Sequence, residues 1–375
     1  MNLNYNGWER DYFDHQAEYK KMFDDCMSLG EQDVDVSFLD NKIAQIANRR
    51  YAVSVANATD GLLFALQAYG VGPGDEVLVP SFGWISSASA VNMAGAEPVF
   101  CDIDIDSYQI TLDSMKKMAG PRTKAVIYPC LFGAMWPEIF DAVNWCKEQD
   151  IIFIEDSAQA LGTELNGVKA GSIGDVSVYS FNDNKVIAGI NGGGAVMTNS
   201  KLTYKHVEKL AYHGRSRTNS DVKYLGRNSK MYLFNAKVIE FRLASIDKWQ
   251  KRRQEIARRY FDNIIDGNDF LVSGPHKQEH KKLPDGLNHN YHKFTVRFTS
   301  NHLRDFVRRH TGANIHYDRP LPSMEYYRKN KKDSTSVAEE VSGTIMTLPC
   351  HAWLLDDEVE NICDLFDHAL WRSYI

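Results

Sequence analysis

One lysine lies in a short polar loop after a predicted strand. The strand is expected over residues 176–181, and the loop reads Ser180-Phe-Asn-Asp-Asn-Lys185. A lysine amine attacks carbonyl groups once burial or a neighbouring cation lowers its pKa. Ser180 could hydrogen-bond a phosphate. Most loop lysines are only solvated, so Lys185 alone does not define a site.

A second group of polar residues follows the apolar run at residues 151–154. It reads Glu155-Asp-Ser-Ala-Gln159. A carboxylate at a strand end can keep a ring nitrogen protonated, because a nearby opposite charge favours the charged form. A metal ligand and a helix cap are alternative roles for the same carboxylates.

Two segments of small residues suit close approach of the backbone to a ligand. Asn57-Ala58-Thr59-Asp60-Gly61 lies between a predicted strand and a predicted helix, where N–H groups attract anions, although a plain helix cap fits equally. Asn191-Gly-Gly-Gly194 permits a tight turn, and a hairpin is its simplest interpretation. Neither segment matches the glycine patterns of triphosphate or nicotinamide sites.

Strand and helix patterns alternate from about residue 40, and the strands are short and apolar along their length. Such strands predict an α/β fold with a mainly parallel, mixed sheet flanked by helices. We expect a large domain over residues 1–245 and a smaller C-terminal α+β domain over residues 246–375, with the boundary in a long helix. Strands are expected at 51–55, 76–79, 98–102, 125–129, 151–155, 176–181, 194–198 and 291–298, and helices at 39–48, 59–69, 84–94, 140–149, 236–263, 301–310 and 359–370.

Composition excludes several functional classes. The 375 residues carry a net charge of -6, so nucleic acid is not an expected partner. The basic stretch 248–259 is interpreted as a solvated helix face. Apolar runs are far shorter than the roughly 20 residues that span a bilayer, and the start lacks a signal-peptide pattern. Six cysteines without a C-x-x-C pair favour neither zinc nor disulfides, which indicates a cytoplasmic protein without a metal site.

The order of these motifs resembles the sugar aminotransferases of fold type I, the DegT/DnrJ/EryC1/StrS family of pyridoxal-phosphate enzymes. The resemblance runs from about residue 40 to residue 370. It rests on a series of short segments: Asn57-Ala-Thr-Asp-Gly-Leu62, Gly72-Pro-Gly-Asp-Glu-Val77, Pro80-Ser-Phe-Gly-Trp84, Pro98-Val-Phe-Cys-Asp102, Glu155-Asp-Ser-Ala-Gln-Ala160, Gly171-Ser-Ile-Gly-Asp175, Ser180-Phe with Lys185, Gly192-Gly-Gly-Ala-Val196, Ile315-His-Tyr317 and Leu348-Pro349.

The resemblance implies a role for each matching residue. Lys185 would form the Schiff base and move the proton. The other roles are Asp156 at the ring nitrogen, Gln159 near the ring hydroxyl, Trp84 stacked on the ring, Ala58, Thr59, Asp60 and Ser180 around the phosphate, Asn235 reaching the phosphate of the other subunit, and His316 and Tyr317 on the substrate side.

The resemblance also implies a reaction. Glutamate would donate an amino group to a nucleotide-linked keto-deoxy sugar, expected to be a 4-keto-6-deoxyhexose for a surface glycan such as the O-antigen of lipopolysaccharide. The enzyme would be a homodimer with active sites shared between subunits. Relatives with histidine in place of the lysine are dehydratases, so Lys185 favours the aminotransferases.

Two positions depart from the family pattern. Asn191 stands where Asp or Glu is common, and Asn235-Ala-Lys237 replaces an Asn-x-Arg segment. Three alternatives stay open at this point: amination at the sugar's 3-position, a catalytically silent member of the same fold that acts as a regulator, and a nucleotide-sugar binding module.

Overall fold

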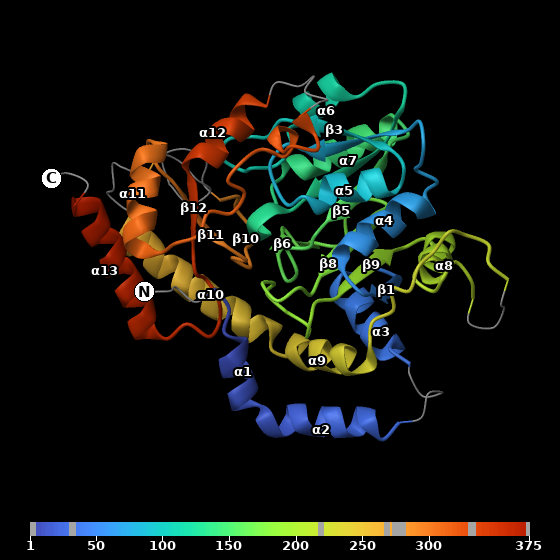
Figure 1. The fold of residues 1–375 in the computed structure, drawn as a ribbon, viewed down its shortest axis with the longest axis horizontal. Coiled ribbons are helices and arrows are strands. Elements are labelled where there is room, and N and C mark those ends of the chain that lie inside the picture. Colours follow the sequence, from blue (N-terminus) through green and yellow to red (C-terminus); the bar gives the residue numbers. More distant parts are fainter. Residues whose placement is uncertain are drawn as a thin grey trace.

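The computed structural model describes residues 5–29, 35–216, 221–265, 271, 283–328 and 335–372. A seven-stranded sheet with the order β1-β9-β8-β5-β4-β2-β3 forms its centre (Figure 1). β9 runs antiparallel to both of its neighbours, and the other adjacent strands are parallel, which confirms the predicted mixed sheet. The strands are β1 (Tyr51–Val55), β2 (Glu76–Pro80), β3 (Glu97–Cys101), β4 (Thr123–Pro129), β5 (Ile152–Asp156), β8 (Val176–Ser180) and β9 (Gly194–Thr198).

Helices cover both faces of the sheet because successive strand residues point to opposite faces. Val77 and Val79 join the apolar core under α4 (Ala58–Ala68), whereas Leu78 joins the core on the opposite face under α7 (Glu138–Glu148). The first face is also covered by α5 (Ser86–Met93) and α8 (Lys201–Leu210), and the second by α6 (Leu112–Met118), α3 (Ser37–Ile46) and α9 (Leu233–Leu243).

The C-terminal part has an apolar core of its own. That core runs from Ile256 in α10 (Ile246–Tyr260) to Ala369 in α13 (Asp356–Arg372). It encloses the antiparallel pair β11 (Phe294–Arg297) and β12 (Ile345–Leu348), beside α11 (Asn301–Thr311) and α12 (Ser336–Thr344). The division at residue 245 stays a prediction, although one expected helix is in fact two, α9 and α10.

The short remaining elements connect these parts. Within the described ranges they are β6 (Glu164–Leu165), β7 (Val168–Lys169), β10 (Leu287–Asn288), 3-10 turns at Leu131–Gly133 and Leu321–Ser323, and a π-helical turn at Phe261–Ile265. None of the helices in the described ranges has an apolar stretch long enough to cross a bilayer.

Two N-terminal helices, α1 (Trp8–Asp14) and α2 (Gln16–Met27), were not predicted. Figure 1 shows α2 lying along α9. Asp11 is fully buried and accepts a hydrogen bond from Arg242 Nε at 2.8 Å and another from the Tyr19 hydroxyl. Arg242 also donates to the Ala188 carbonyl at 2.7 Å, so this network connects the N-terminal helices to the loop that carries Lys185.

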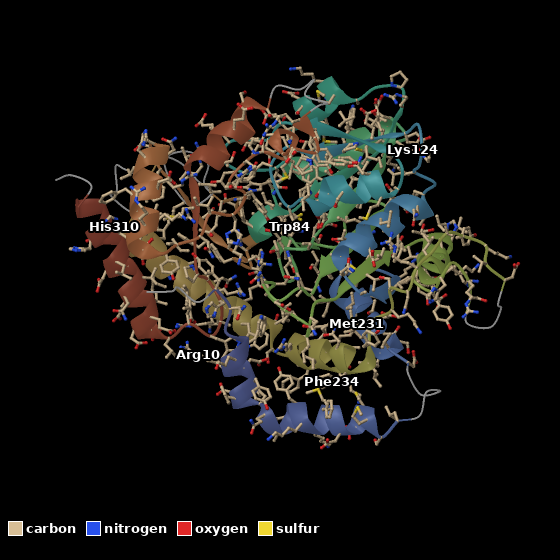
Figure 2. The ribbon with its side chains drawn as sticks, in the orientation of Figure 1. Arg10, Trp84, Lys124, Met231, Phe234 and His310 are labelled. Atoms are coloured by element: carbon tan, nitrogen blue, oxygen red, sulfur yellow. The ribbon has the colours of Figure 1, made fainter. Side chains whose placement is uncertain are left out.

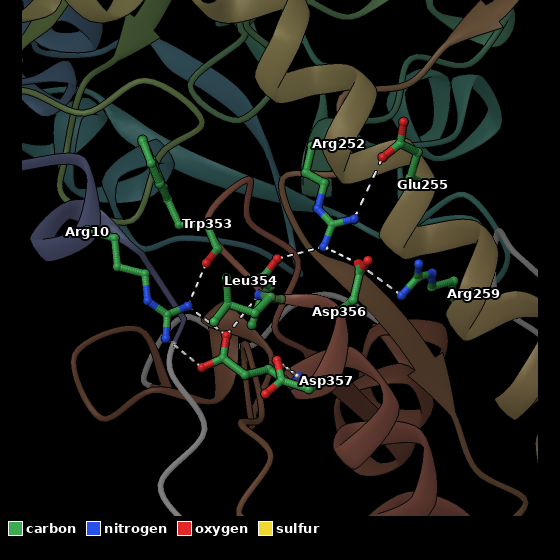
Figure 3. A network of polar contacts seen from close by, with 10 residues as sticks. Arg10, Arg252, Glu255, Arg259, Trp353, Leu354, Asp356 and Asp357 are labelled. Carbon is green, nitrogen blue, oxygen red and sulfur yellow. Dashed lines mark hydrogen bonds and ion pairs between the residues drawn. The ribbon is translucent and has the colours of Figure 1, made fainter. Parts of the chain in front are cut away.

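A second network joins α1 and α10 to the start of α13 (Figure 3). Arg10 donates to the Trp353 carbonyl at 2.6 Å and to both carboxylate oxygens of Glu358 at 2.7 Å. Arg252 and Arg259 both contact Asp356, at 2.8 and 3.0 Å. The side chains of these pairs are partly exposed, so each pair adds little stability by itself.

Candidate active site

The residues singled out in the sequence gather at the carboxyl ends of the parallel strands, where ligands of open α/β sheets bind. Gly194, at the start of β9, is the register partner of both Val55 and Ser180. Asp156 ends the neighbouring strand β5 and pairs with Val178, two residues before Ser180. The start of α4, Ser180 and Asp156 are therefore collected at one edge of the sheet.

Lys185 and Asp156 form the electrostatic centre of this edge. Burial lowers the pKa of Lys185 to about 8, and the Asp156 carboxylate opposes that shift. Burial likewise raises the pKa of Asp156, while the Ala158 N–H and Lys185 oppose the rise. Lys185 keeps part of its surface exposed, whereas Asp156 is 9% exposed. The amine thus has a pKa near the physiological range and a carboxylate as its neighbour.

The first turn of α4 presents hydrogen-bond donors at the same edge. Asn57 caps the helix by accepting the Asp60 N–H at 2.8 Å. Helix geometry leaves the N–H groups of Ala58 and Thr59 without an intrahelical acceptor, and these groups attract anions. The Thr59 hydroxyl lies 2.7 Å from the Ser86 hydroxyl.

The Asp60 carboxylate is an acceptor, and its partners belong to this chain. It accepts from the Ser229 hydroxyl at 2.7 Å and from Arg227 at 3.1 Å. The Asn57 amide is a third donor to this carboxylate, at 3.4 Å. The predicted place of Asp60 beside a phosphate stays a prediction, and it would rest on the position of this residue in the first turn of the helix.

Gly194 shows how closely β9 approaches this helix start. A methyl group on Gly194 would lie 2.6 Å from the Ala58 nitrogen and 2.6 Å from the Asn57 carbonyl carbon. Real Cβ atoms do not approach other atoms so closely, so only glycine allows the strand and the helix start to meet here. The glycine run predicted as a turn thus also shapes the anion-suited edge.

Gln159 and Tyr317 lie together although 158 residues separate them. Gln159 Nε2 donates to the Tyr317 hydroxyl at 2.9 Å, and its Oε1 accepts the Phe132 N–H at 2.7 Å. Asn290 donates to the Gln159 carbonyl at 2.9 Å, and Gly133 leaves room for it, because a methyl group there would lie 1.9 Å from Asn290 Oδ1. Hydrogen bonds from Asn290 and to Tyr317 therefore attach the C-terminal part to this edge of the sheet.

His316 has one tautomer fixed by its partner. Its Nδ1 lies 2.6 Å from the Thr347 hydroxyl, and that hydroxyl donates its own proton to the Asn314 carbonyl at 3.1 Å. His316 Nδ1 must then be the donor, which leaves Nε2 as an acceptor. Burial and the nearby Lys293 and Lys185 lower the pKa of His316 to about 3, so the ring is neutral.

Trp84 and Asn235 complete the predicted set. Trp84 is 60% exposed and lies near the middle of the molecule in Figure 2. Asn235 accepts the Ile190 N–H at 2.6 Å and donates to the Gly192 carbonyl at 2.8 Å. Its amide therefore shapes the glycine loop of its own chain, and contact with another subunit stays a prediction.

Several residues of this region were missed. Ser86, Phe132 and Asn290 act through contacts with distant segments, for which the sequence carries no local signal. Arg253 is different: it is 4% exposed, so the interpretation of residues 248–259 as a solvated face is wrong for it. Its spacing of four from Trp249 and seven from Tyr260, both buried, could have placed it on the buried face.

The edge fits a phosphorylated pyridine cofactor. Oδ1 of the buried Asp156 carboxylate accepts from the Ala158 N–H at 3.1 Å, which leaves Oδ2 as a further acceptor. That oxygen is suited to a protonated ring nitrogen. The donors at the start of α4 suit a phosphate, and Lys185 suits an aldehyde. The fold and the site together define an α/β enzyme of amino-group chemistry.

The chain belongs to the DegT/DnrJ/EryC1/StrS aminotransferase family, whose model matches residues 21–367. It is 29% identical to the UDP-N-acetyl-3-dehydro-alpha-D-glucosamine 3-aminotransferase of Acidithiobacillus ferrooxidans, over 95% of this chain and 97% of that one. It is 28% identical to the dTDP-4-dehydro-2,3,6-trideoxy-D-glucose 4-aminotransferase of Saccharopolyspora spinosa, over 85% and 84%.

A solved structure extends the likeness to the whole fold. DesV of S. venezuelae, determined with a ketimine intermediate, superposes with a TM-score of 0.88 at 26% identity and covers 98% of each chain. The predicted family, fold and transaminase class are confirmed, and pyridoxal phosphate is the cofactor of this family, as expected.

Proposed function

We propose that this enzyme moves an amino group from an amino acid to a nucleotide-linked keto sugar, with Lys185 as the residue that holds pyridoxal phosphate. The pairing of Lys185 with Asp156 at the strand ends carries the proposal. An amine whose pKa is about 8 is neutral often enough near neutral pH to bond to an aldehyde, and to take and return a proton.

The other residues of the edge would hold the cofactor. Pyridoxal phosphate supplies an electron sink for the pair of electrons that remains when a carbon loses its proton. Asp156 would lie at the ring nitrogen and keep it protonated. The first-turn amides of α4, the Thr59 hydroxyl and Ser180 would hold the phosphate. Trp84 would cover the ring, which contributes about 0.5–1.5 kcal/mol beyond area burial, and Gln159 would lie near the ring hydroxyl.

Asn235 would act at a site shared between two subunits of a homodimer. Its amide fixes the loop around Ile190 and Gly192, and Ile190 is 42% exposed beside that loop. A well-ordered loop with an exposed apolar residue is suited to contact with a second chain. The departure from Asn-x-Arg leaves Lys237 in the position of the usual arginine.

His316 and Tyr317 would contact the sugar. The neutral His316 offers an acceptor at Nε2, which suits a sugar hydroxyl. We expect glutamate as the donor and the 4-keto group of a 6-deoxyhexose as the acceptor, because the loop from Ser180 to Lys185 is similar to that of the 4-aminating enzymes. The product would enter a surface glycan such as an O-antigen.

Amination at the 3-position is the second candidate. The relative from Acidithiobacillus ferrooxidans is named as a 3-aminotransferase and matches over nearly the whole chain. The relative named as a 4-aminotransferase matches at a similar identity. The two outcomes therefore need a direct assay of the product.

The test is incubation of the purified enzyme with glutamate and a panel of nucleotide-linked 3-keto and 4-keto sugars, followed by mass and position analysis. We expect one aminated sugar, and no product with Lys185→Ala. Lys201→Ala, at an exposed lysine of α8, is the matched control and should keep full turnover. Turnover by Lys185→Ala, or a colourless wild type that borohydride does not change, would contradict the proposal and favour a silent regulator.

A further inference from the structure

Three basic residues that were not assigned to the reaction lie near Lys185: Arg253 in α10, and His292 and Lys293 before β11. Their exposed fractions are 4–5%. Burial lowers the pKa of each, and the positive charges of Lys185 and Arg253 lower the pKa of Lys293 further, to about 7. The charges of Lys293, Lys185 and Arg253 also lower the pKa of His292, so two amines, a guanidinium and a neutral imidazole form one cluster.

Arg253 and Lys293 of this cluster have no carboxylate partner among the described residues. Buried cations are normally paired with carboxylates, because an unpaired buried charge is costly. Asp156 supports the charge of Lys185. Among the described residues, the group that opposes the lowered pKa of Arg253 and Lys293 is the Cys350 thiol, and its own pKa of about 11 leaves it uncharged near neutral pH. An anion from outside the chain would therefore be stabilised here.

Two atoms of the cluster have unused hydrogen-bonding capacity. Arg253 donates from Nη1 to the Tyr291 carbonyl at 3.1 Å and to the Cys350 carbonyl. Its buried Nε has no partner in the described ranges, and neither has His292 Nδ1. Buried polar atoms usually find partners, so these two atoms point to a ligand or a water.

A small cavity joins Arg253 and His292 to Lys185, and Lys293 Nζ lies 5.6 Å from the ring centroid of Tyr5, another residue of its walls. Arg253, His292 and Lys185 contribute to its walls, together with Tyr5 and Asn6. It has about 10 Å³ of space for water-sized molecules, which is room for one water. A carboxylate oxygen can take the place of that water, whereas a sugar ring or a whole phosphate group cannot.

We propose that Arg253, His292 and Lys293 form an anion subsite that receives the carboxylate of the amino donor. The inference rests on the proposed function, in which Lys185 moves the proton of the donor's amino-bearing carbon. In an α-amino acid the carboxylate is bonded to that same carbon. A donor whose reacting carbon is next to Lys185 must therefore place its carboxylate beside Lys185, where the unbalanced cations lie.

The test measures binding of glutarate, a dicarboxylate without an amino group, to the cofactor-loaded enzyme by calorimetry. Lys293→Met should weaken glutarate binding by about 10-fold or more, because a charge-assisted hydrogen bond is lost. Lys293→Arg should restore most of the affinity. Lys124→Met makes the same substitution at an exposed lysine, labelled at the edge of the molecule in Figure 2, and should leave glutarate binding unchanged.

A second readout separates this role from a structural one. Removal of an unpaired buried cation should leave the thermal midpoint of Lys293→Met equal to or above that of the wild type. Lys293→Gln serves as the second variant if Lys293→Met does not fold. Unchanged glutarate affinity in a folded variant would overturn the inference. A variant that loses affinity for pyrophosphate and keeps its affinity for glutarate would overturn it as well, since the subsite would then bind the phosphates of the nucleotide.

Failure of the subsite and failure of the proposed function give different results. If the wild type converts its cofactor with glutamate and Lys293→Met does so at the same half-saturating concentration, the subsite is refuted while the aminotransferase role stands. If the wild type binds glutarate through Lys293 and yet no amino acid changes its cofactor spectrum, the proposed function fails and the anion subsite stands.

Discussion

The pKa of Lys185 makes a direct prediction for the cofactor-free enzyme. Only the neutral amine bonds to an aldehyde, so the rate of pyridoxal phosphate capture should follow the neutral fraction of Lys185. With a pKa of about 8, that fraction is roughly 0.1 at pH 7, 0.5 at pH 8 and 0.9 at pH 9. The rate should rise about fivefold from pH 7 to pH 8 and less than twofold from pH 8 to pH 9.

A variant of Asp156 tests how this carboxylate affects the pKa of Lys185. Its carboxylate favours the charged form of Lys185, so Asp156→Asn should move the midpoint of the capture rate to a pH below 8. The same change should weaken the final complex, because the ring nitrogen loses its acceptor. Asp150→Asn, an exposed acid just before β5, should leave the midpoint in place.

Stopped-flow mixing of the enzyme with the cofactor measures these rates from the growth of visible absorbance. An ordinary lysine, with a pKa near 10.4, would give a rise of about tenfold per pH unit up to pH 9 without a plateau. That result would refute the argument from burial. An identical midpoint in Asp156→Asn and the wild type would refute the electrostatic pairing with Lys185.

Three further variants test the packing around the site. Asp11→Asn should lower the free energy of unfolding, measured in urea, by about 3 kcal/mol, because Arg242 stays buried without its carboxylate partner. Gly194→Ala should cost about 1–3 kcal/mol by differential scanning calorimetry and should lower cofactor affinity, since the strand and the first turn of α4 must separate. Tyr317→Phe should lower the free energy of unfolding by about 1–3 kcal/mol, because Gln159 loses a hydrogen-bond partner. A double-mutant cycle with Gln159→Leu measures the coupling between the two residues, and zero coupling would contradict this prediction.

The sheet could be predicted from the sequence because its strands carry a strong local signal. The observed bounds of β1 and β9 are the predicted ones, since both are short apolar runs between turn residues. The N-terminal helices gave no such signal. The buried residues of α1 and α2 are Asp11 and Tyr19, so neither helix shows an apolar stripe. Their attachment through a buried ion pair has no pattern in the sequence.

The sequence predicts those residues of the candidate site that directly follow a strand. Asp156, Ser180 and Lys185 follow buried strands, so the edge rule for α/β sheets brings them together. The contact of Gln159 with Tyr317, and the charge of Lys293 near Lys185, depend on how the C-terminal part docks on the sheet. Neither feature has a local spacing, which is why the sequence predicts the proposed cofactor side of the site and not the proposed donor side.

The proposed subsite also predicts proton uptake when an anion binds. Lys293 has a pKa of about 7 and is mostly neutral at pH 8. A bound carboxylate favours its charged form, so glutarate binding at pH 8 should take up close to one proton, and binding at pH 6 should take up almost none. The charged and titratable groups that face Lys293 are Lys185, Arg253, Cys350, Tyr5, His292 and His316.

Calorimetry in buffers of different ionisation heat measures this uptake. The observed binding enthalpy at pH 8 should depend on the buffer in the wild type and lose most of that dependence in Lys293→Met, which cannot take a proton at this position. His292 and His316 have pKa values lowered too far to titrate near pH 8, and under the proposed function Lys185 would be bonded to the cofactor in the loaded enzyme. A buffer-independent enthalpy in the wild type at pH 8 would mean that the anion does not meet Lys293.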